Sequence, residues 1–191
     1  MVNTDSIGLE RGTVRVVSYN PDWHISFQVE RDLLRNALGS KVLEIRHIGS
    51  TAIPGMPAKP IIDIVAAVQS LGEVSDFVDA LVRLGYEDKG DGSVVGRRYF
   101  VKGNAGARTH HLNFYEMNSS GWTSHIFFCE YLKSHKEVAE EYAKLKQKLA
   151  NEFPADRASY TNGKERFVAA VAERAASEGT SALKSTMQPR S

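Results

Sequence analysis

The chain has 191 residues and a mass of 21.1 kDa, enough for one sizeable hydrophobic core and short for two. Its 24 basic and 23 acidic residues nearly cancel, which excludes a general attraction to nucleic acid or to an anionic membrane. The single cysteine, Cys129, favours a reducing compartment, and neither a signal peptide nor a membrane-spanning run is recognisable. We therefore expect a cytoplasmic protein.

The first half of the chain is predicted to contain three strands and one long helix. Residues 14–19 are predicted to form a strand, and a helix is expected to follow from Asn20, which can cap it, to Gly39. Residues 41–48 and 61–68 are two further strands, of which the second is apolar on both faces and so belongs in the centre of a covered sheet. The buried stripe of the helix is predicted to be Trp23, Phe27, Leu34 and Leu38.

The second half begins with a predicted helix that ends at Gly85. Residues 93–102 and 107–116 follow as the two strands of a hairpin. The remainder is predicted to be helical, in segments 123–133, 135–153 and 163–176. Residues 14–176 contain neither a repeat nor an internal linker and are predicted to form one domain, between a mobile leader (1–13) and a mobile tail (177–191).

The residues with chemical potential gather around the loop before the strand 61–68. Gly49 permits a tight turn, and the backbone amides and hydroxyls of Ser50 and Thr51 suit phosphate oxygens, to which Lys59 adds a positive charge. Asp63 stands within the apolar strand, where an unpaired carboxylate costs several kcal/mol. The acid therefore needs a cation, a set of hydrogen-bond donors, or a position at the solvent-exposed end of the strand.

The hairpin strands are expected to supply the groups that meet this acid. Strand alternation places Ile61, Asp63 and Val65 on one face of the strand. The groups predicted to converge on that face are Arg98, Lys102, Arg108, His111 and Asn113. Such a cluster of cations and polar groups around one carboxylate would form a phosphate-binding site.

Six segments of the chain resemble the GrpB family in order and spacing: VRVVSYNPDW, RHIGSTAIPGMPAKPIIDIV, GRRYFVKG, RTHHLNFYE, FFCEYLKSHKEVAEEYAKLK and YTNGKERFV. The resemblance covers roughly Val14 to Ala175 and implies a nucleotidyltransferase-like α/β fold, a mixed β-sheet flanked by helices with a helical C-terminal part. In that superfamily a glycine and a serine hold a triphosphate, and acids on the next strands hold Mg²⁺. Gly49 and Ser50 match the first pair, and Asp63 matches the first acid.

Three positions depart from the pattern that the resemblance implies. Active nucleotidyltransferases carry a second acid two residues after the first, where this chain has Val65. Asn113 replaces a histidine that many family members have, and Cys129 stands where an arginine is common. One carboxylate holds Mg²⁺ poorly unless substrate phosphates add ligands, and an asparagine cannot be a general base.

Each candidate residue also has a structural interpretation. The segment Gly49–Thr51 can be an ordinary turn, Asp63 can be satisfied by loop amides, and His111 can be a hydrogen-bonded strand residue. The hairpin cations can form a solvated face. Lys164 is predicted at a helix start, where anions bind but plain capping turns are more common.

Three functions of different classes follow. The first is Mg²⁺- or Mn²⁺-dependent nucleotidyl transfer from an NTP to a small acceptor, with Asp63 and His111 catalytic and with Asp63 and Asn113 as metal ligands. Its phosphate contacts would be Gly49, Ser50, Thr51, Lys59, Arg98, Lys102, Arg108 and Lys164. The second is a non-catalytic module for a nucleotide or phosphorylated metabolite. The third is a folding-accessory role, because domains similar to GrpB are fused to dephospho-CoA kinase, although this chain has no P-loop motif.

The expected partners are therefore a nucleotide and an unidentified small-molecule acceptor. No membrane is expected among the partners, the sequence carries no strong signal for nucleic acid, and a homodimer is left open.

Overall fold

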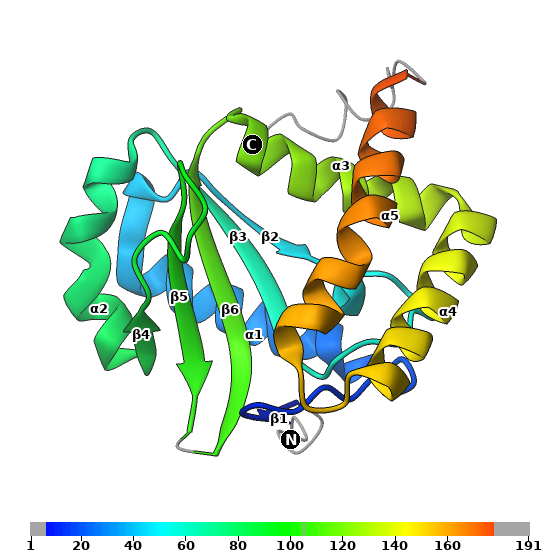
Figure 1. The fold of residues 1–191 in the computed structure, drawn as a ribbon. Helices are drawn as coiled ribbons and strands as arrows, with labels where there is room; N and C mark the ends of the chain where they lie inside the picture. Colours follow the sequence, from blue (N-terminus) through cyan, green and yellow to red (C-terminus); the bar gives the residue numbers. More distant parts are fainter. Residues whose placement is uncertain (1–6, 105, 178–191) are drawn as a thin grey trace.

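The computed structural model describes residues 7–104 and 106–177, whose strands form a six-stranded mixed sheet (Figure 1). The strand order is β2-β3-β6-β5-β4, and β1 pairs with β6 beside this path. β3 and β6 run parallel, whereas every other pair in the sheet is antiparallel. The strands are β1 (Leu9–Glu10), β2 (Glu44–Ile48), β3 (Ile62–Val68), β4 (Tyr86–Asp88), β5 (Arg98–Gly103) and β6 (Ala107–Glu116).

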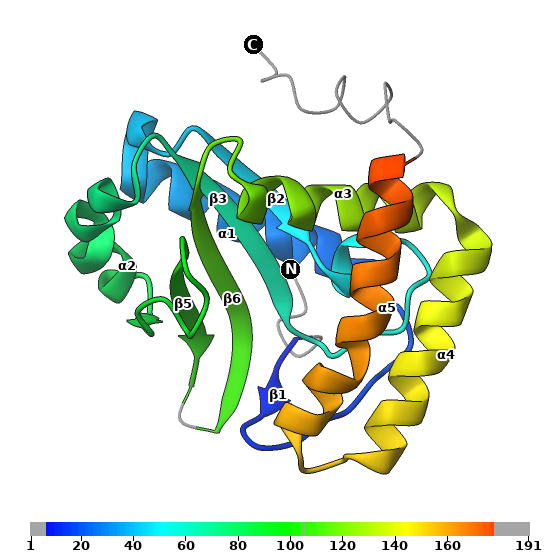
Figure 2. The same cartoon turned by 45° about the horizontal axis from the view of Figure 1, so that its top comes forward.

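Helices cover both faces of the sheet. Figures 1 and 2 show α1 and α2 on one side, with α3, α4 and α5 on the other. None of the helices in the described part of the chain is long and apolar enough to cross a membrane. The helices are α1 (Asp22–Leu38), α2 (Val78–Arg83), α3 (Ser120–Ser134), α4 (Lys136–Glu152) and α5 (Arg157–Ser177), with short 3₁₀ segments η2 (Gly39–Lys41), η3 (Ser50–Ala52) and η4 (Leu71–Phe77).

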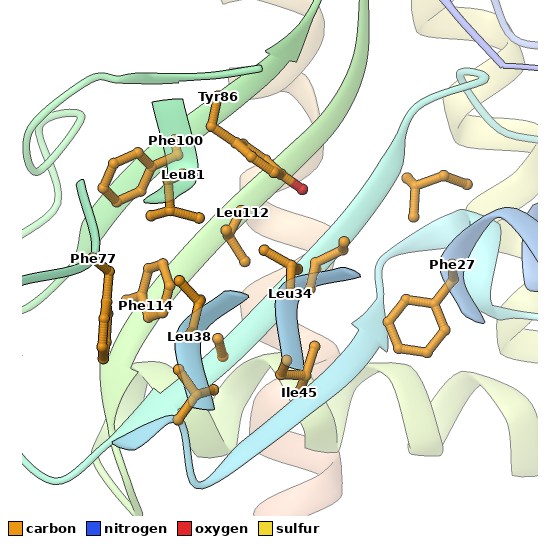
Figure 3. Packing of buried hydrophobic residues seen from close by; sticks show 14 of the residues in the cluster. Phe27, Leu34, Leu38, Ile45, Phe77, Leu81, Tyr86, Phe100, Leu112 and Phe114 are labelled. Atoms are coloured by element: carbon orange, nitrogen blue, oxygen red, sulfur yellow. The ribbon is translucent and has the colours of Figure 1, made fainter. Parts of the chain in front are cut away.

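The main core fills the space between the sheet, α1 and α2 (Figure 3). Phe114 of β6 packs there against the rings of Phe77 and Phe100, with ring centroids 6.1 Å and 5.8 Å apart. On the other face of the sheet, Val65 packs in a separate cluster with Trp122 of α3. The alternation of side chains along β3 thus buries one set of residues on each face, as the apolar sequence of this strand predicts.

The predicted fold class is confirmed, and so are the hairpin and most of the predicted helices. Trp23, Phe27, Leu34 and Leu38 all lie buried on α1, and the amide of Asp22 donates to Asn20 Oδ1 at 2.9 Å. Strand β4, which pairs with β5 at the edge of the sheet, was not predicted.

Two predictions near the N-terminus are wrong. Residues 14–19 do not form a strand of the sheet, because only Val17 makes an isolated bridge, to Ala58. Leu9, which falls within the predicted mobile leader, is buried and pairs with Arg108 of β6.

The remaining boundary predictions concern the chain ends. The last helix begins at Arg157, earlier than the predicted residue 163, and extends to Ser177, the first residue of the predicted tail. The rest of the predicted leader and tail, residues 1–6 and 178–191, lies outside the described residues.

Substitution of the central core residue Phe114 by alanine tests this packing. We expect Phe114→Ala to lower the free energy of unfolding by about 3–5 kcal/mol, because the residue is fully buried between two other rings. The melting temperature should fall by at least about 6 °C, measured by circular dichroism and urea titration. Val95→Ala is the control, since Val95 is 97% exposed, and equal stability of the two variants would contradict the assigned core.

Candidate functional site

A two-part cleft opens between the sheet and the C-terminal helices. The cationic lobe, of about 270 Å³, lies between the Gly49–Lys59 loop, α4 and the start of α5. The apolar lobe, of about 380 Å³, lies between β2, β5, β6, α3 and the end of α5. The two lobes share three lining residues: Gly49, Asp63 and His111.

Asp63 and His111 face each other where the lobes meet. They are register partners on the parallel strands β3 and β6, and His111 Nδ1 lies 2.8 Å from Asp63 Oδ1. Burial alone would raise the pKa of Asp63, but the hydrogen bond and charge of His111, followed by the charges of Lys59 and Lys164, outweigh burial and lower it. The Asp63 side chain remains 36% exposed and therefore presents an ionised carboxylate to the cleft.

Gly49 places the loop backbone against this carboxylate. It has a φ of +69°, and a Cβ atom at this position would lie only 2.7 Å from Asp63 Oδ2. A side chain is therefore excluded both by the backbone conformation and by the acid. The predicted role of Gly49 as the residue of a tight turn agrees with this geometry.

The two hydroxyl residues of the loop have different surroundings. Ser50 Oγ accepts a hydrogen bond from Lys146 Nζ at 2.8 Å and lines the cationic lobe. Thr51 also lines the lobe, but its buried hydroxyl lies 2.9 Å from His47 Nε2 and donates to the Ile61 carbonyl at 3.4 Å. Thr51 thus anchors the loop, and Ser50 is the hydroxyl available to a ligand.

Four cationic side chains line the cationic lobe. Lys146 is only 2% exposed, donates to Ser50 Oγ and to the Pro57 carbonyl, and has its pKa lowered to about 7, chiefly by burial. Burial also lowers the pKa of Lys164, to about 8, and that of Lys59. Lys59 and Lys164 both lie over the Tyr160 ring, at 5.1 Å and 4.4 Å. The fourth cation is Arg157, at the start of α5.

Sequence reasoning missed two of these cations, Lys146 and Arg157. One signal could have identified Lys146, because it lies four residues after Tyr142 in the apolar stripe of α4. A lysine at such a position is buried and therefore needs polar partners. Arg157 lies next to a turn and carries no comparable signal in the sequence.

The structure corrects the predicted positions of Arg98 and Lys102. Both lie on the face of the sheet opposite the cleft, where Arg98 pairs with Asp88 and Lys102 Nζ lies 2.8 Å from Glu30 Oε2. The register pairs Val101 with His111, so alternating side chains bring Arg97, rather than Arg98, to the apolar lobe.

The two other predicted cations have different outcomes. Arg108 does not line either lobe among the described residues, although its charge helps to lower the pKa of Lys59. Lys164 does line the cationic lobe, but it lies well inside α5 and not at a helix start as predicted.

The residues at the predicted metal site do not fit a dedicated Mg²⁺ site. Asn113 Oδ1 accepts from the guanidinium of Arg97 at 3.4 Å, and Asn113 Nδ2 donates to the Ile64 carbonyl at 3.2 Å. Val65, at the second-acid position, is fully buried. No group of three or more histidine, cysteine, aspartate or glutamate residues suited to a metal occurs within 7–104 and 106–177. The surroundings of Asp63 instead suit an anion.

Comparisons with known sequences identify proteins that are similar to this chain. The model of the GrpB protein family matches residues 13–174. The chain is 40% identical to UPF0157 protein YqkA of Bacillus subtilis, over 85% of this chain and 47% of that protein, so it spans about half of the length of YqkA. It is 38% identical to glutamate-rich protein GrpB of Alkalihalophilus pseudofirmus, over 85% of this chain and 95% of that protein. It is also 28% identical to dephospho-CoA kinase of Mycobacterium tuberculosis, over 87% of this chain and 47% of that protein.

Solved structures agree with these relatives. Conserved protein GrpB from Enterococcus faecalis superposes with a TM-score of 0.80 and 32% identity, over 91% of this chain and all of that chain. The Cid1 poly(U) polymerase superposes with a TM-score of 0.51 and 16% identity, over 71% of this chain and 44% of that chain. The second likeness concerns the fold alone and agrees with the predicted nucleotidyltransferase-like architecture.

Replacement of Lys146 by methionine tests whether this lysine destabilises the fold. The pKa of Lys146 lies at about 7 instead of its ordinary 10.5, so the unfolded chain binds more protons between these values, and stability should rise with pH in that window. We expect Lys146→Met to raise the free energy of unfolding by about 1 kcal/mol, or the melting temperature by about 2–4 °C, near neutral pH and below. The gain should vanish above about pH 10.

Lys148→Met provides the matched control, because Lys148 is an exposed lysine of the same helix. Its substitution should change stability little at any pH. A lower melting temperature of Lys146→Met below neutral pH would show that the hydrogen bonds of Lys146 outweigh its desolvation.

Proposed function

This chain belongs to the GrpB family, and we propose that its cleft binds a nucleotide through the phosphate chain. The observation that carries the proposal is the junction of a cationic lobe with an apolar lobe at Asp63 and His111. A nucleotide has the same division, with charged phosphates at one end and a flat heteroaromatic ring at the other. Pockets of this kind, with a few convergent polar groups, are typical small-molecule sites.

The cationic lobe supplies the groups that a phosphate chain requires. Lys59, Lys164 and Arg157 provide positive charge, and arginine additionally matches two phosphate oxygens with its planar fork. Ser50 also lines this lobe. The sequence predicts that its hydroxyl and its backbone amide bind phosphate oxygens. Charge-assisted hydrogen bonds of this kind are the stronger ones in proteins.

The apolar lobe suits a planar ring. Tyr99 and Phe128 line it together with Ile48 and Val168, which gives apolar and aromatic surface on several sides. Polar groups occur among the same lining residues, namely Ser124, His125 and Asn113. Such groups can discriminate between bases by hydrogen bonding to ring edges, which is how specificity arises in apolar pockets.

Nucleotidyl transfer to a small acceptor is the second candidate function, and His111 favours it. Asp63 orients the imidazole through Nδ1, and His111 Nε2 is buried with no hydrogen-bond partner among the described residues. In this candidate reaction Nε2 takes the proton of an acceptor hydroxyl. The hydroxyl oxygen then bonds to the α-phosphorus, the bond from that phosphorus to the β-bridging oxygen breaks, and pyrophosphate leaves.

A folding-accessory role is the third candidate. It is suggested by the similarity to part of the dephospho-CoA kinase of Mycobacterium tuberculosis. An accessory domain of this kind needs no ligand, so it predicts a cleft that is indifferent to nucleotides. The three candidates therefore differ in what nucleotides do to the protein.

Nucleotide titration of the full chain tests the proposal. We expect ATP, GTP, CTP or UTP to raise the melting temperature and to give a measurable Kd by calorimetry. Ser50→Ala should weaken binding by about tenfold, because one hydrogen bond to a charged phosphate is lost. Ser40→Ala is the control, since Ser40 is an exposed residue of η2 outside the cleft.

The other outcomes separate the three candidates. Release of pyrophosphate from a labelled NTP together with appearance of the labelled nucleotidyl group on an added hydroxyl acceptor, assayed with Mg²⁺, Mn²⁺ or EDTA, would identify transfer. Absence of any thermal shift or heat with all four nucleotides would overturn the proposal and leave the accessory role. Equal affinity of Ser50→Ala and the parent chain would remove Ser50 from the phosphate contacts.

A further inference from the structure

We propose that the cationic lobe binds the phosphate chain directly, without a divalent cation, and that its lysine and arginine side chains supply the charge that a metal ion would otherwise provide. This inference rests on the proposed function and specifies the form of the ligand, a free polyphosphate anion. It differs from the expectation of a Mg²⁺-dependent site.

The charge of the lobe is the first argument. Its lining contains four cationic side chains, Lys59, Lys146, Arg157 and Lys164, and one carboxylate, that of Asp63. A divalent ion beside Asp63 would add two positive charges to a cluster that already has a large positive excess. Because like charges at short distance repel even at the high effective dielectric of a protein surface, the cluster disfavours the ion and favours a polyanion.

The scarcity of free oxygen ligands around Asp63 is the second argument. Asp63 Oδ1 lies 2.8 Å from His111 Nδ1, and the backbone of Gly49 approaches Oδ2 so closely that a Cβ atom would lie 2.7 Å away. Val65 is fully buried beside Trp122, and Asn113 Oδ1 faces the guanidinium of Arg97. A Mg²⁺ ion beside Asp63 would therefore take nearly all of its octahedral oxygen ligands from water and from the phosphates themselves.

The uncompensated positive charge of the lysines provides a third argument, which points to an anion. Lys146 is 2% exposed and contacts a hydroxyl, a carbonyl and the ring of Tyr142, none of which carries a full negative charge. Lys59 and Lys164 both lie over the Tyr160 ring, and the positive charge of neighbouring groups adds to burial in lowering the pKa of each. A bound phosphate chain would place negative charge between these groups, which relieves the repulsion and restores their charged forms.

Calorimetric titration of ATP in two buffers tests the inference. At about pH 6.5, where the lysines are largely protonated, the Kd measured with excess EDTA should equal or fall below the Kd measured with excess Mg²⁺. The reason is that Mg²⁺ neutralises part of the charge that the lobe recognises. Inorganic triphosphate should compete with ATP in EDTA, because the phosphate chain provides most of the attraction.

The possible failures are distinguishable. Binding that appears only with Mg²⁺ or Mn²⁺ would overturn this inference and leave the proposed function intact. Absence of binding in both buffers would overturn the proposed function itself.

Substitution of Asp63 gives a test in which the two mechanisms predict opposite signs. Asn can keep the hydrogen bond to His111 Nδ1 while removing the negative charge, so Asp63→Asn should tighten ATP binding in EDTA by about threefold or more. A metal-mediated site would instead lose most of its affinity, because its main ligand is gone. Asp79→Asn, at an exposed site on α2, is the matched control and should leave the Kd unchanged.

A second variant keeps the test valid if Asp63→Asn folds poorly. Lys164→Gln should weaken binding in EDTA by about tenfold, and Lys148→Gln, an exposed lysine on α4, should not. Circular dichroism and thermal melts verify the folding of each variant. Unchanged affinity of Lys164→Gln would overturn the assignment of the lobe as the phosphate site.

Discussion

The contact between Asp63 and His111 is the interaction on which the cleft depends. Because β3 and β6 are parallel and in register, the two residues lie side by side on adjacent strands and point to the same face. That contact keeps a carboxylate ionised in an otherwise apolar strand. It also marks the point where the cationic and apolar lobes meet, so the acid and the histidine line both lobes.

The cleft is built at a cost in stability. Burial, to which the charges of neighbouring cations add, disfavours the charged forms of Lys59, Lys146 and Lys164 and lowers all three pKa values. A structural role alone would be served as well by apolar side chains, since replacement of buried charges by apolar groups is often neutral or stabilising. Retention of several cations around one acid is therefore typical of a site that binds negative charge, and perturbed lysines frequently lie at functional sites.

Much of the fold and part of the site were accessible to prediction, and the errors have physical causes. Periodicity identified α1, and the glycine, serine and aspartate pattern identified the loop and the acid. The predicted position of Arg98 was wrong because a shift of strand register by one residue moves every side chain of that strand to the other face of the sheet. The register of β5 is fixed by its pairing with β6, which the sequence does not specify. The failed strand at 14–19 shows that β-propensity alone does not provide a partner strand.

The amino-acid order by itself determined most of the helices and the central strands, the family resemblance, and the need of Asp63 for a partner. The elements follow from local periodicity, and the need for a partner follows from the cost of burying an isolated charge. Only the tertiary structure decided which partner this is and which cations surround it. Lys146 and Arg157 reach the cleft from helices far along the chain. Lys102 instead pairs with Glu30 on the opposite face of the sheet. Convergence of distant residues depends on strand register and helix packing, which no local pattern specifies.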